Sequence, residues 1–223
     1  MTTRTFALRG ALVVALGAAT ALLASDADAQ IIKVPTPDEA RTPISVSASF
    51  GFLQTQDRFD GQSGAQWYLG EALQYRGSLE YGTTSGSLAL VGSLANVPIA
   101  RSGGSSTGFS DGTIQLRQLL AAFRTPETPG AHQIVEVGVG VSQWANYSGT
   151  DALTADEAKA RNAFTLVVGY GFGFTVGSRA SIAMVQDMST LWGSKEGLPA
   201  GRSRSVRQYT TRLGLRYRFF GAR

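Results

Sequence analysis

The segment at residues 211–219 (TRLGLRYRF) alternates strictly between two kinds of side chain. Apolar groups, beginning with the methyl of Thr211, occupy every second position, and arginine or glycine fills the positions between them. Successive side chains of a β-strand point to opposite faces, so this period of two predicts a strand with one apolar and one polar face. The chain must then build a sheet whose two faces meet different surroundings.

Seven earlier segments show the same alternation. They cover residues 44–52, 73–81, 87–96, 113–124, 135–142, 164–174 and 180–187. Within 113–124 the apolar residues change parity, which predicts a β-bulge near Gln118. Strands of about ten residues match the length of a tilted membrane-spanning strand, whereas soluble sheets more often use about five or six. The sequence therefore predicts an all-β fold of eight long strands.

The connections between these segments alternate in length. The long ones are 55–67, 97–112, 145–161 and 189–205, and the short ones are 82–86, 125–131 and 177–178. Bacterial outer-membrane barrels combine short periplasmic turns with longer external loops. The pattern predicts an antiparallel up-and-down barrel with both ends in the periplasm. The Gly-rich stretch 101–108 reads as a flexible external loop.

The composition decides which face meets lipid. Only 16% of the residues are charged, and the face opposite the apolar one is mostly Gly, Ser, Ala and Thr. A soluble barrel would need charged residues along its outside, so we expect the apolar face to point into lipid. Aromatic residues near the strand ends then predict two interfacial girdles. The outer girdle is Phe50, Phe52, Trp67, Tyr68, Trp144, Tyr147 and Trp192; the inner one is Tyr81, Phe123, Phe172, Phe174, Tyr217 and Phe219.

The other face carries a set of charges that would lie inside the barrel. An eight-stranded barrel has room for side chains but not for an aqueous pore. Buried charges are tolerated when they are paired, so we expect an interior network in which the carboxylates neutralise the arginines. A gated proton or ion path is the alternative interpretation. The residues are Arg76, Glu80, Arg117, Glu136, Asp187, Arg212 and Arg216.

The N-terminal region predicts export. Residues 1–29 combine two arginines, the short apolar core 10–24 and an Ala-Asp-Ala cleavage box, as in a cleaved signal peptide. Residues 30–43 contain three prolines and read as a tether, because proline disrupts both helices and strand ladders. The barrel is expected to span residues 44–220.

The last strand carries a specific motif. Arg212, Gly214, Tyr217 and Phe219 occupy the defined positions of the terminal assembly signal of outer-membrane barrels. With the strand and loop pattern, the chain resembles the small eight-stranded outer-membrane barrels of the OmpA, OmpX and OmpW kind. The resemblance implies a monomeric transmembrane barrel with a filled polar interior in the bacterial outer membrane. Its partners would be outer-membrane lipids, lipopolysaccharide and the barrel-assembly machinery.

The sequence offers little for catalysis. Cysteine is absent and His132 is the one histidine. Lipid A deacylases of this architecture resemble a His-x-Ser arrangement, but here Gln133 and Ile134 follow His132. We therefore predict no enzymatic activity and interpret His132 as a solvated residue of a periplasmic turn.

Metal and nucleic-acid sites are also not expected. Asp57 with Asp60, or the group Asp151, Asp156 and Glu157, lack the spacing of a calcium motif and read as solvated loop charges. No metal or cofactor is predicted. The net charge is +4, but an exported chain does not meet nucleic acid. Cations of the fourth long loop are instead expected to contact lipopolysaccharide phosphates. They are Lys195, Arg202, Arg204 and Arg207.

Three functions remain open at this point. The first is a structural, surface-interaction or adhesion role without catalysis. The second is a narrow channel for a solute or ion. The third is a periplasmic, lipocalin-like barrel that binds lipid, in which the apolar face would point inward.

Overall fold

The computed structural model describes residues 44–219, apart from positions 62, 84, 105–108, 150–158 and 178. The predicted signal peptide at 1–29 and the tether at 30–43 lie outside the described residues, as do Asp151, Asp156 and Glu157. No helix among the described residues is long and apolar enough to cross a membrane.

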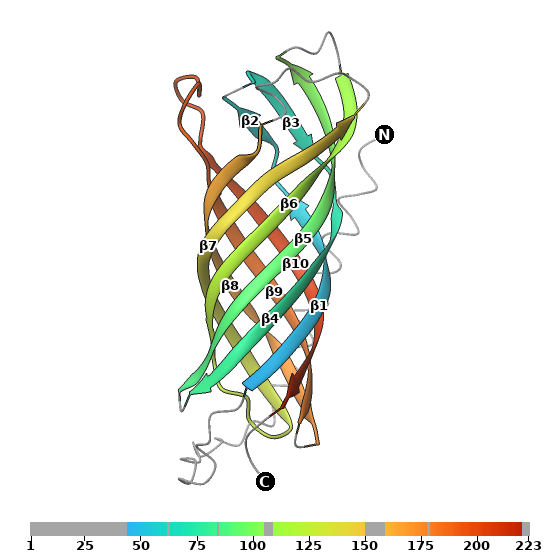
Figure 1. Cartoon of the computed structure of the whole chain (residues 1–223), viewed down its shortest axis with the longest axis vertical. Helices are drawn as coiled ribbons and strands as arrows, with labels where there is room; N and C mark the ends of the chain where they lie inside the picture. The colour runs from blue at the N-terminus through green and yellow to red at the C-terminus, as the bar shows by residue number, and fades with distance from the viewer. Residues whose placement is uncertain are drawn as a thin grey trace, which may run out of the picture. The chain divides into compact units, whose positions relative to one another are not determined.

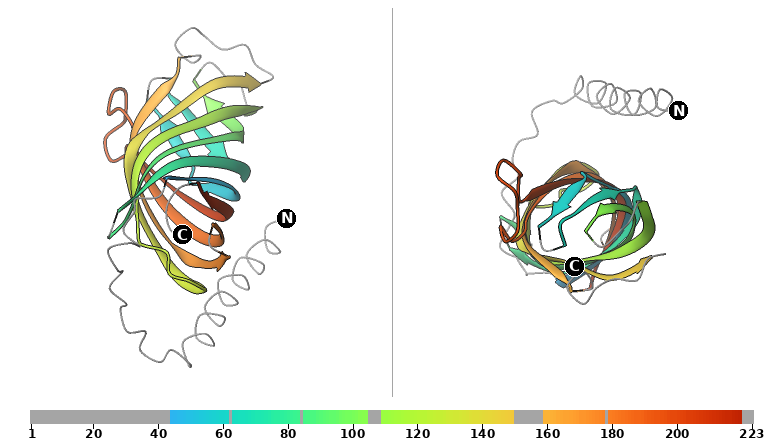
Figure 2. Two further views of the ribbon diagram at one scale, coloured as in Figure 1. Left: turned by 60° about the horizontal axis from the view of Figure 1, so that its bottom comes forward. Right: turned by 90° about the horizontal axis from the view of Figure 1, so that it is seen from above.

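Eight antiparallel strands close into a barrel (Figure 1 and Figure 2, right). Each pairs with its neighbours along the chain, and β1 closes the ring by pairing with both β4 and β10. The predicted all-β, eight-stranded, up-and-down barrel is confirmed. The strands are β1 (Ile44–Thr55), β4 (Ala72–Thr83), β5 (Gly86–Gly103), β6 (Phe109–Arg124), β7 (Ala131–Gly149), β8 (Arg161–Val176), β9 (Ala180–Trp192) and β10 (Ser205–Arg218).

Alternation places large apolar side chains on the outer wall. On β8, Phe164, Val168 and Phe174 are 40–56% exposed, while Gly169 and Gly171 face the interior. The stretch from Phe164 to Phe174 rises about 33 Å along the strand. A strand tilt of roughly 40° reduces this rise to about 25 Å, the height of the apolar band of outer-membrane barrels. The outer wall is therefore built to stand in lipid.

The strands continue beyond this band at the external end, the end opposite the short turns. The predicted loop at 97–112 is wrong, because β5 runs to Gly103 and β6 begins at Phe109. The outward residues there are polar or small, so a search for hydrophobic alternation ends too early. Backbone pairing nevertheless continues, as in the pairs Asn96 with Gln115 and Ala100 with Asp111.

The first external connection contains a hairpin in addition to the eight strands of the closed ring. Its strands are β2 (Arg58–Asp60) and β3 (Ala65–Leu69). β3 pairs with the upper part of β5 and continues the line of β4, whereas β2, among the described residues, pairs only with β3. Seen from above, the hairpin lies across the opening of the barrel (Figure 2, right). The wall thus opens between β2 and β10, where the β1–β10 ladder ends at Thr55.

The predicted bulge near Gln118 is wrong. The register of β6 and β7 shifts between Thr113 and Gln115, opposite Asn146, whose φ is 52°. The change of parity has another cause, because Ile114 and Leu116 point inward into an apolar cluster while Leu119 points outward.

The aromatic girdles were predicted correctly only in part. Phe50 and Phe52 are exposed on the outer wall, but Trp67 and Trp144 are buried inside, with exposed fractions of 3% and 0%. At the inner end, Tyr217 and Phe219 are exposed and pack edge to face, with ring centroids 5.1 Å apart. Their positions suit the assembly-signal motif, in which Gly214 and the buried Arg212 face the other way.

A charge placed in the middle of the lipid-facing wall tests this orientation. Val139→Arg, at an outward position of β7, should destabilise the barrel in vesicles by about 2–4 kcal/mol. The matched control Gln143→Arg lies two outward positions further up the same strand and should cost about 0–1 kcal/mol. Urea unfolding in vesicles measures both, and equal effects would contradict the proposed position of the lipid band.

Candidate functional site: the filled interior and the external pocket

Side chains fill the barrel interior in layers. An apolar cluster lies beneath the external opening. It contains Leu53, Ala65, Trp67, Leu69, Ala72, Ala95, Val97, Ile99, Ile114, Leu116, Trp144, Ala163, Leu191 and Val206. Below it, Gln118 accepts a hydrogen bond from Gln74 at 3.1 Å and donates one to Ser142 at 3.0 Å. Ionised groups occupy the layers below these amides.

Glu136 on β7 is the centre of the ionic network. Its carboxylate receives Arg76 from β4, Arg124 from β6 at 2.8 Å and Arg212 from β10 at 3.1 Å. Asp187 on β9 receives Arg212 at 2.7 Å and Arg76 at 3.3 Å. Gly169 on β8 leaves the space these carboxylates need, since a β-carbon there would clash with Asp187. One cluster of charges thus ties together five of the strands.

The network continues to the inner end of the barrel. Glu80 receives Arg124 at 3.0 Å and Arg216 at 2.9 Å. Glu127, from the β6–β7 turn, receives Arg216 at 2.9 Å and Arg218 at 3.5 Å. Burial would raise the pKa of Glu127, but the charges and hydrogen bonds of its partners, led by Arg216, lower it below its ordinary value.

Within the buried part of this network the charges balance. Four arginines (76, 124, 212 and 216) face four carboxylates (80, 127, 136 and 187), and the side chains of all eight are at most 9% exposed. Arg218 adds a fifth guanidinium at the rim, where its side chain is 24% exposed. A balanced set satisfies the requirement that buried charges be paired.

The structure brings six of the seven predicted interior residues into this network. The interior placement of Arg117 is wrong: it is exposed on the outer wall, where its Nε donates to Gln115 at 2.6 Å. Sequence reasoning missed Arg124 and Glu127. Arg124 shares the parity of Gln118 and could have been found from it, but Glu127 lies in a turn without periodicity.

His132 is not a solvated turn residue, and that interpretation was wrong. It lies inside the inner end of the barrel with 8% of its surface exposed. Its Nδ1 lies 3.1 Å from the carbonyl oxygen of Gly130. Within the described part of the chain, no His, Asp or Glu side chains form a group of three that could hold a metal ion.

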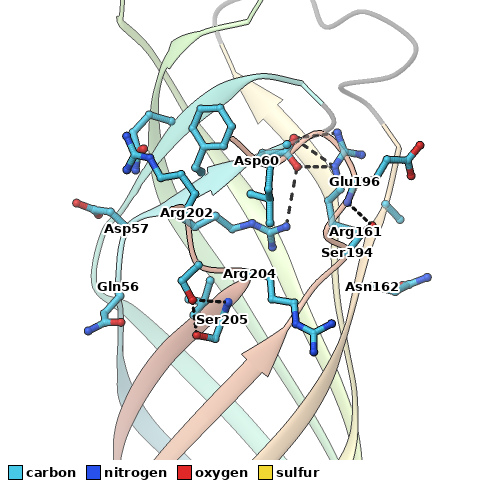
Figure 3. Close-up of a pocket in the computed structure, with 18 residues that line it drawn as sticks. Gln56, Asp57, Asp60, Arg161, Asn162, Ser194, Glu196, Arg202, Arg204 and Ser205 are labelled. Atoms are coloured by element: carbon cyan, nitrogen blue, oxygen red, sulfur yellow. Dashed lines mark hydrogen bonds and ion pairs between the residues drawn. The ribbon is translucent and has the colours of Figure 1, made fainter. Parts of the chain in front are cut away.

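A pocket of about 410 Å³ opens at the external mouth (Figure 3). It lies where the barrel wall opens, between the β1–β2 segment, the start of β8 and the β9–β10 connection. Asp60 is a buried residue of its lining. It receives Arg161 through two hydrogen bonds of 3.1 Å and lies 3.9 Å from Arg58. The description of Asp60 as a solvated loop charge was therefore wrong.

Asp60 has a lowered pKa in the pocket. Burial alone would raise its pKa, but hydrogen bonds from Arg161 and Ser63 and the charges of Arg161 and Arg58 lower it below the ordinary value. Two guanidinium groups therefore face one carboxylate. Asp57 is engaged separately, since it accepts a hydrogen bond from the backbone of Leu69 at 3.1 Å.

The four cations predicted to contact lipopolysaccharide do not form one patch. Arg202 and Arg204 line the pocket, and the guanidinium of Arg202 lies 5.6 Å from the ring centre of Phe59. Lys195 is exposed in the β9–β10 connection. Arg207 points outward from β10, one outward position above Tyr209.

Two glycines allow a close backbone contact beside the pocket. A β-carbon on Gly61 would lie 2.7 Å from the carbonyl carbon of Gly197 and 2.8 Å from the nitrogen of Leu198. Gly197 also has a φ of +69°, in the left-handed region that favours glycine. The first and fourth external connections therefore touch backbone to backbone.

A closed ring of eight strands, with an apolar outer wall and a charged, filled interior, defines the class of small outer-membrane β-barrels. No protein-family model and no curated protein matches the chain. Among solved structures, the chain is similar to Neisserial surface protein A, with 11% identity, a TM-score of 0.50, and 79% of this chain and 97% of that chain covered.

Two further solved structures match less closely. OprG from Pseudomonas aeruginosa shows 13% identity and a TM-score of 0.47 over 82% of this chain and 98% of that one. Ail of Yersinia pestis, in complex with the heparin analogue sucrose octasulfate, shows 18% identity and a TM-score of 0.44 over 79% and 99%. At this identity the similarity concerns the fold.

Removing the central carboxylate tests the interior network. Glu136→Gln leaves three guanidinium groups short of a counter-charge and should destabilise the barrel by about 3–5 kcal/mol. The exposed Glu196→Gln, at the external mouth, is the matched control and should change stability by less than about 0.5 kcal/mol. Urea unfolding in vesicles gives both values. An unchanged free energy of unfolding in Glu136→Gln would show that the network does not stabilise the fold.

Proposed function

We propose that the protein is a non-conducting barrel of the bacterial outer membrane with a structural and surface-interaction role, performed at its external mouth without catalysis. One observation carries this proposal. A polar pocket opens outward at the external end, while an apolar cluster and a charge-balanced network occupy the interior beneath it.

The alternatives fit the structure less well. An ion path would have to cross the packed layer of mostly apolar side chains that contains Trp67, Leu116 and Trp144. A periplasmic lipid carrier would need an apolar cavity and a polar outside. Here the outer wall carries exposed residues such as Val141 and Leu215, at 58% and 55%, and side chains occupy the interior.

The proposed partners follow from the outer wall. Outer-membrane lipid would cover the apolar band, and the barrel-assembly machinery would read the exposed Tyr217 and Phe219 of β10. The closed ring leaves no strand edge within the band, which supports a monomer.

We place the contact with lipopolysaccharide on a polar collar rather than in the pocket. The collar is the set of outward residues directly above the apolar band, and it includes Arg117 and Arg207. Toward the external end, Arg117 is the next outward residue above Leu119 on β6, and Arg207 is the next above Tyr209 on β10. The strands β6 and β10 lie four strands apart in the ring. Neither makes an ion pair within the described residues. Their height and free charge suit the phosphates of a glycolipid headgroup.

Single-channel recording tests the non-conducting role. Purified protein in planar bilayers should give no resolved current steps, because the interior is filled. Trp144→Ala should thin the apolar layer and Glu136→Ala should unbalance the network. Wild-type steps whose size changes in either variant would assign conduction to the interior and overturn the proposal.

Stability in two membranes tests the collar. Lipopolysaccharide vesicles should stabilise the wild type relative to phospholipid vesicles by about 1 kcal/mol per collar arginine. The double variant Arg117→Gln, Arg207→Gln should lose most of this gain, and the pocket variant Arg202→Gln, Arg204→Gln should keep it. If the pocket variant loses the gain instead, the lipopolysaccharide contact lies in the fourth connection.

A further inference from the structure

We propose that the external pocket binds an anionic saccharide, meaning a mono- or disaccharide that carries a sulfate, phosphate or carboxylate group. The inference rests on the proposed surface-interaction function and names the ligand class of the same site. The pocket volume of about 410 Å³ lies within the range of roughly 300–1,000 Å³ typical of small-ligand sites.

The charges of the pocket favour an anion. Arg58 and Arg161 both face the carboxylate of Asp60, and Asp57 and Glu196 also line the pocket, so four arginines stand among three carboxylates. Arg202 and Arg204 stand on the wall and make no ion pair with any described residue (Figure 3). Guanidinium groups match the planar and tetrahedral oxyanions of carboxylates, sulfates and phosphates through paired N–H donors.

Arg202 is the arginine held in place for this role. Its guanidinium lies over the ring of Phe59, so part of its side-chain freedom is already lost before a ligand arrives. A group ordered in advance costs less entropy when it binds, which favours recognition of a weakly held ligand.

The remaining lining favours a sugar over an apolar ligand. It supplies three side-chain amides, from Gln56, Gln66 and Asn162, and hydroxyls from Ser194, Ser203 and Ser205. Amides and hydroxyls both donate and accept hydrogen bonds, as sugar hydroxyls do. Apolar lining is sparse, so a lipid tail or another apolar molecule would leave these polar groups without partners.

The pocket is formed before a ligand binds. The Asp60–Arg161 pair joins β2 to β8 across the opening, with both side chains at most 3% exposed. The contact between Gly61 and Gly197 joins the first connection to the fourth. Two separate links therefore fix the walls that present Arg202 and the serines.

Ligand-observed NMR with the full-length mature barrel in lipid nanodiscs tests the inference. The probes are N-acetylglucosamine 6-sulfate, N-acetylglucosamine and inorganic sulfate. We expect the sulfated sugar to bind at least about tenfold more tightly than either fragment alone, because it engages arginines and polar lining together. Equal binding of inorganic sulfate, or no binding of the sulfated sugar, would overturn the assignment of an anionic saccharide.

The variants separate the pocket from general electrostatics. Arg202→Gln with Arg204→Gln should weaken binding at least about tenfold and leave the barrel folded, since neither side chain takes part in an ion pair and Arg202 loses only its contact with Phe59. Arg117→Gln with Arg207→Gln removes the same charge from the outer wall and should leave binding intact. Equal losses in the two double variants would contradict a specific site. If the sulfated sugar does not bind and the bilayer recordings show no current steps, only the ligand class is rejected. If the protein conducts in the bilayer, the proposed function is rejected.

Discussion

The structure depends on the pairing of buried charge around Glu136. An eight-stranded barrel is too narrow for bulk water, so every ionised side chain inside it needs an opposite charge within reach. Glu136 and Asp187 meet this need with arginines from β4, β6 and β10. Since each partner comes from a different strand, these ion pairs form together only when the ring is closed in the right register. The network therefore specifies the arrangement of the strands as well as filling the space between them.

The lipid imposes the complementary constraint from outside. A backbone group in hydrocarbon has no other partner, so the ladder must close on itself, and β1 does this by pairing on both sides. Above the apolar band the constraint ends, because water can satisfy the backbone. There the β1–β10 ladder stops at Thr55 and β2 turns away across the opening. The external pocket forms at this break, at the place where closure is no longer required.

The sequence predicted the features that follow from both the surrounding lipid and the hydrogen-bonded ladder of strands. Alternation located all eight barrel strands and separated the outward Leu215 from the inward Arg216, because both faces were strongly marked. It failed near the mouth, where the inner face is apolar as well. Because Ile114 and Leu116 are apolar but point inward, the alternating Arg117 was wrongly assigned to the interior. Trp67 and Trp144 were misplaced for the same reason. The Asp60–Arg161 pair spans 101 positions and shows no local pattern, so only the fold could reveal it.

The two arginine groups of the molecule differ in what holds them. The four buried arginines of the network are neutralised by four carboxylates and cannot be offered to a ligand without breaking these ion pairs. Arg202 and Arg204 stand outside the ring, contribute no ion pair to it, and can bind an anion at no cost to the barrel. The ion pairs that hold the barrel together are inside, and the arginines that remain available to a ligand are at the external mouth. This separation is why a filled barrel can still have a function at its surface: the stability of the scaffold does not depend on the residues that would recognise a ligand.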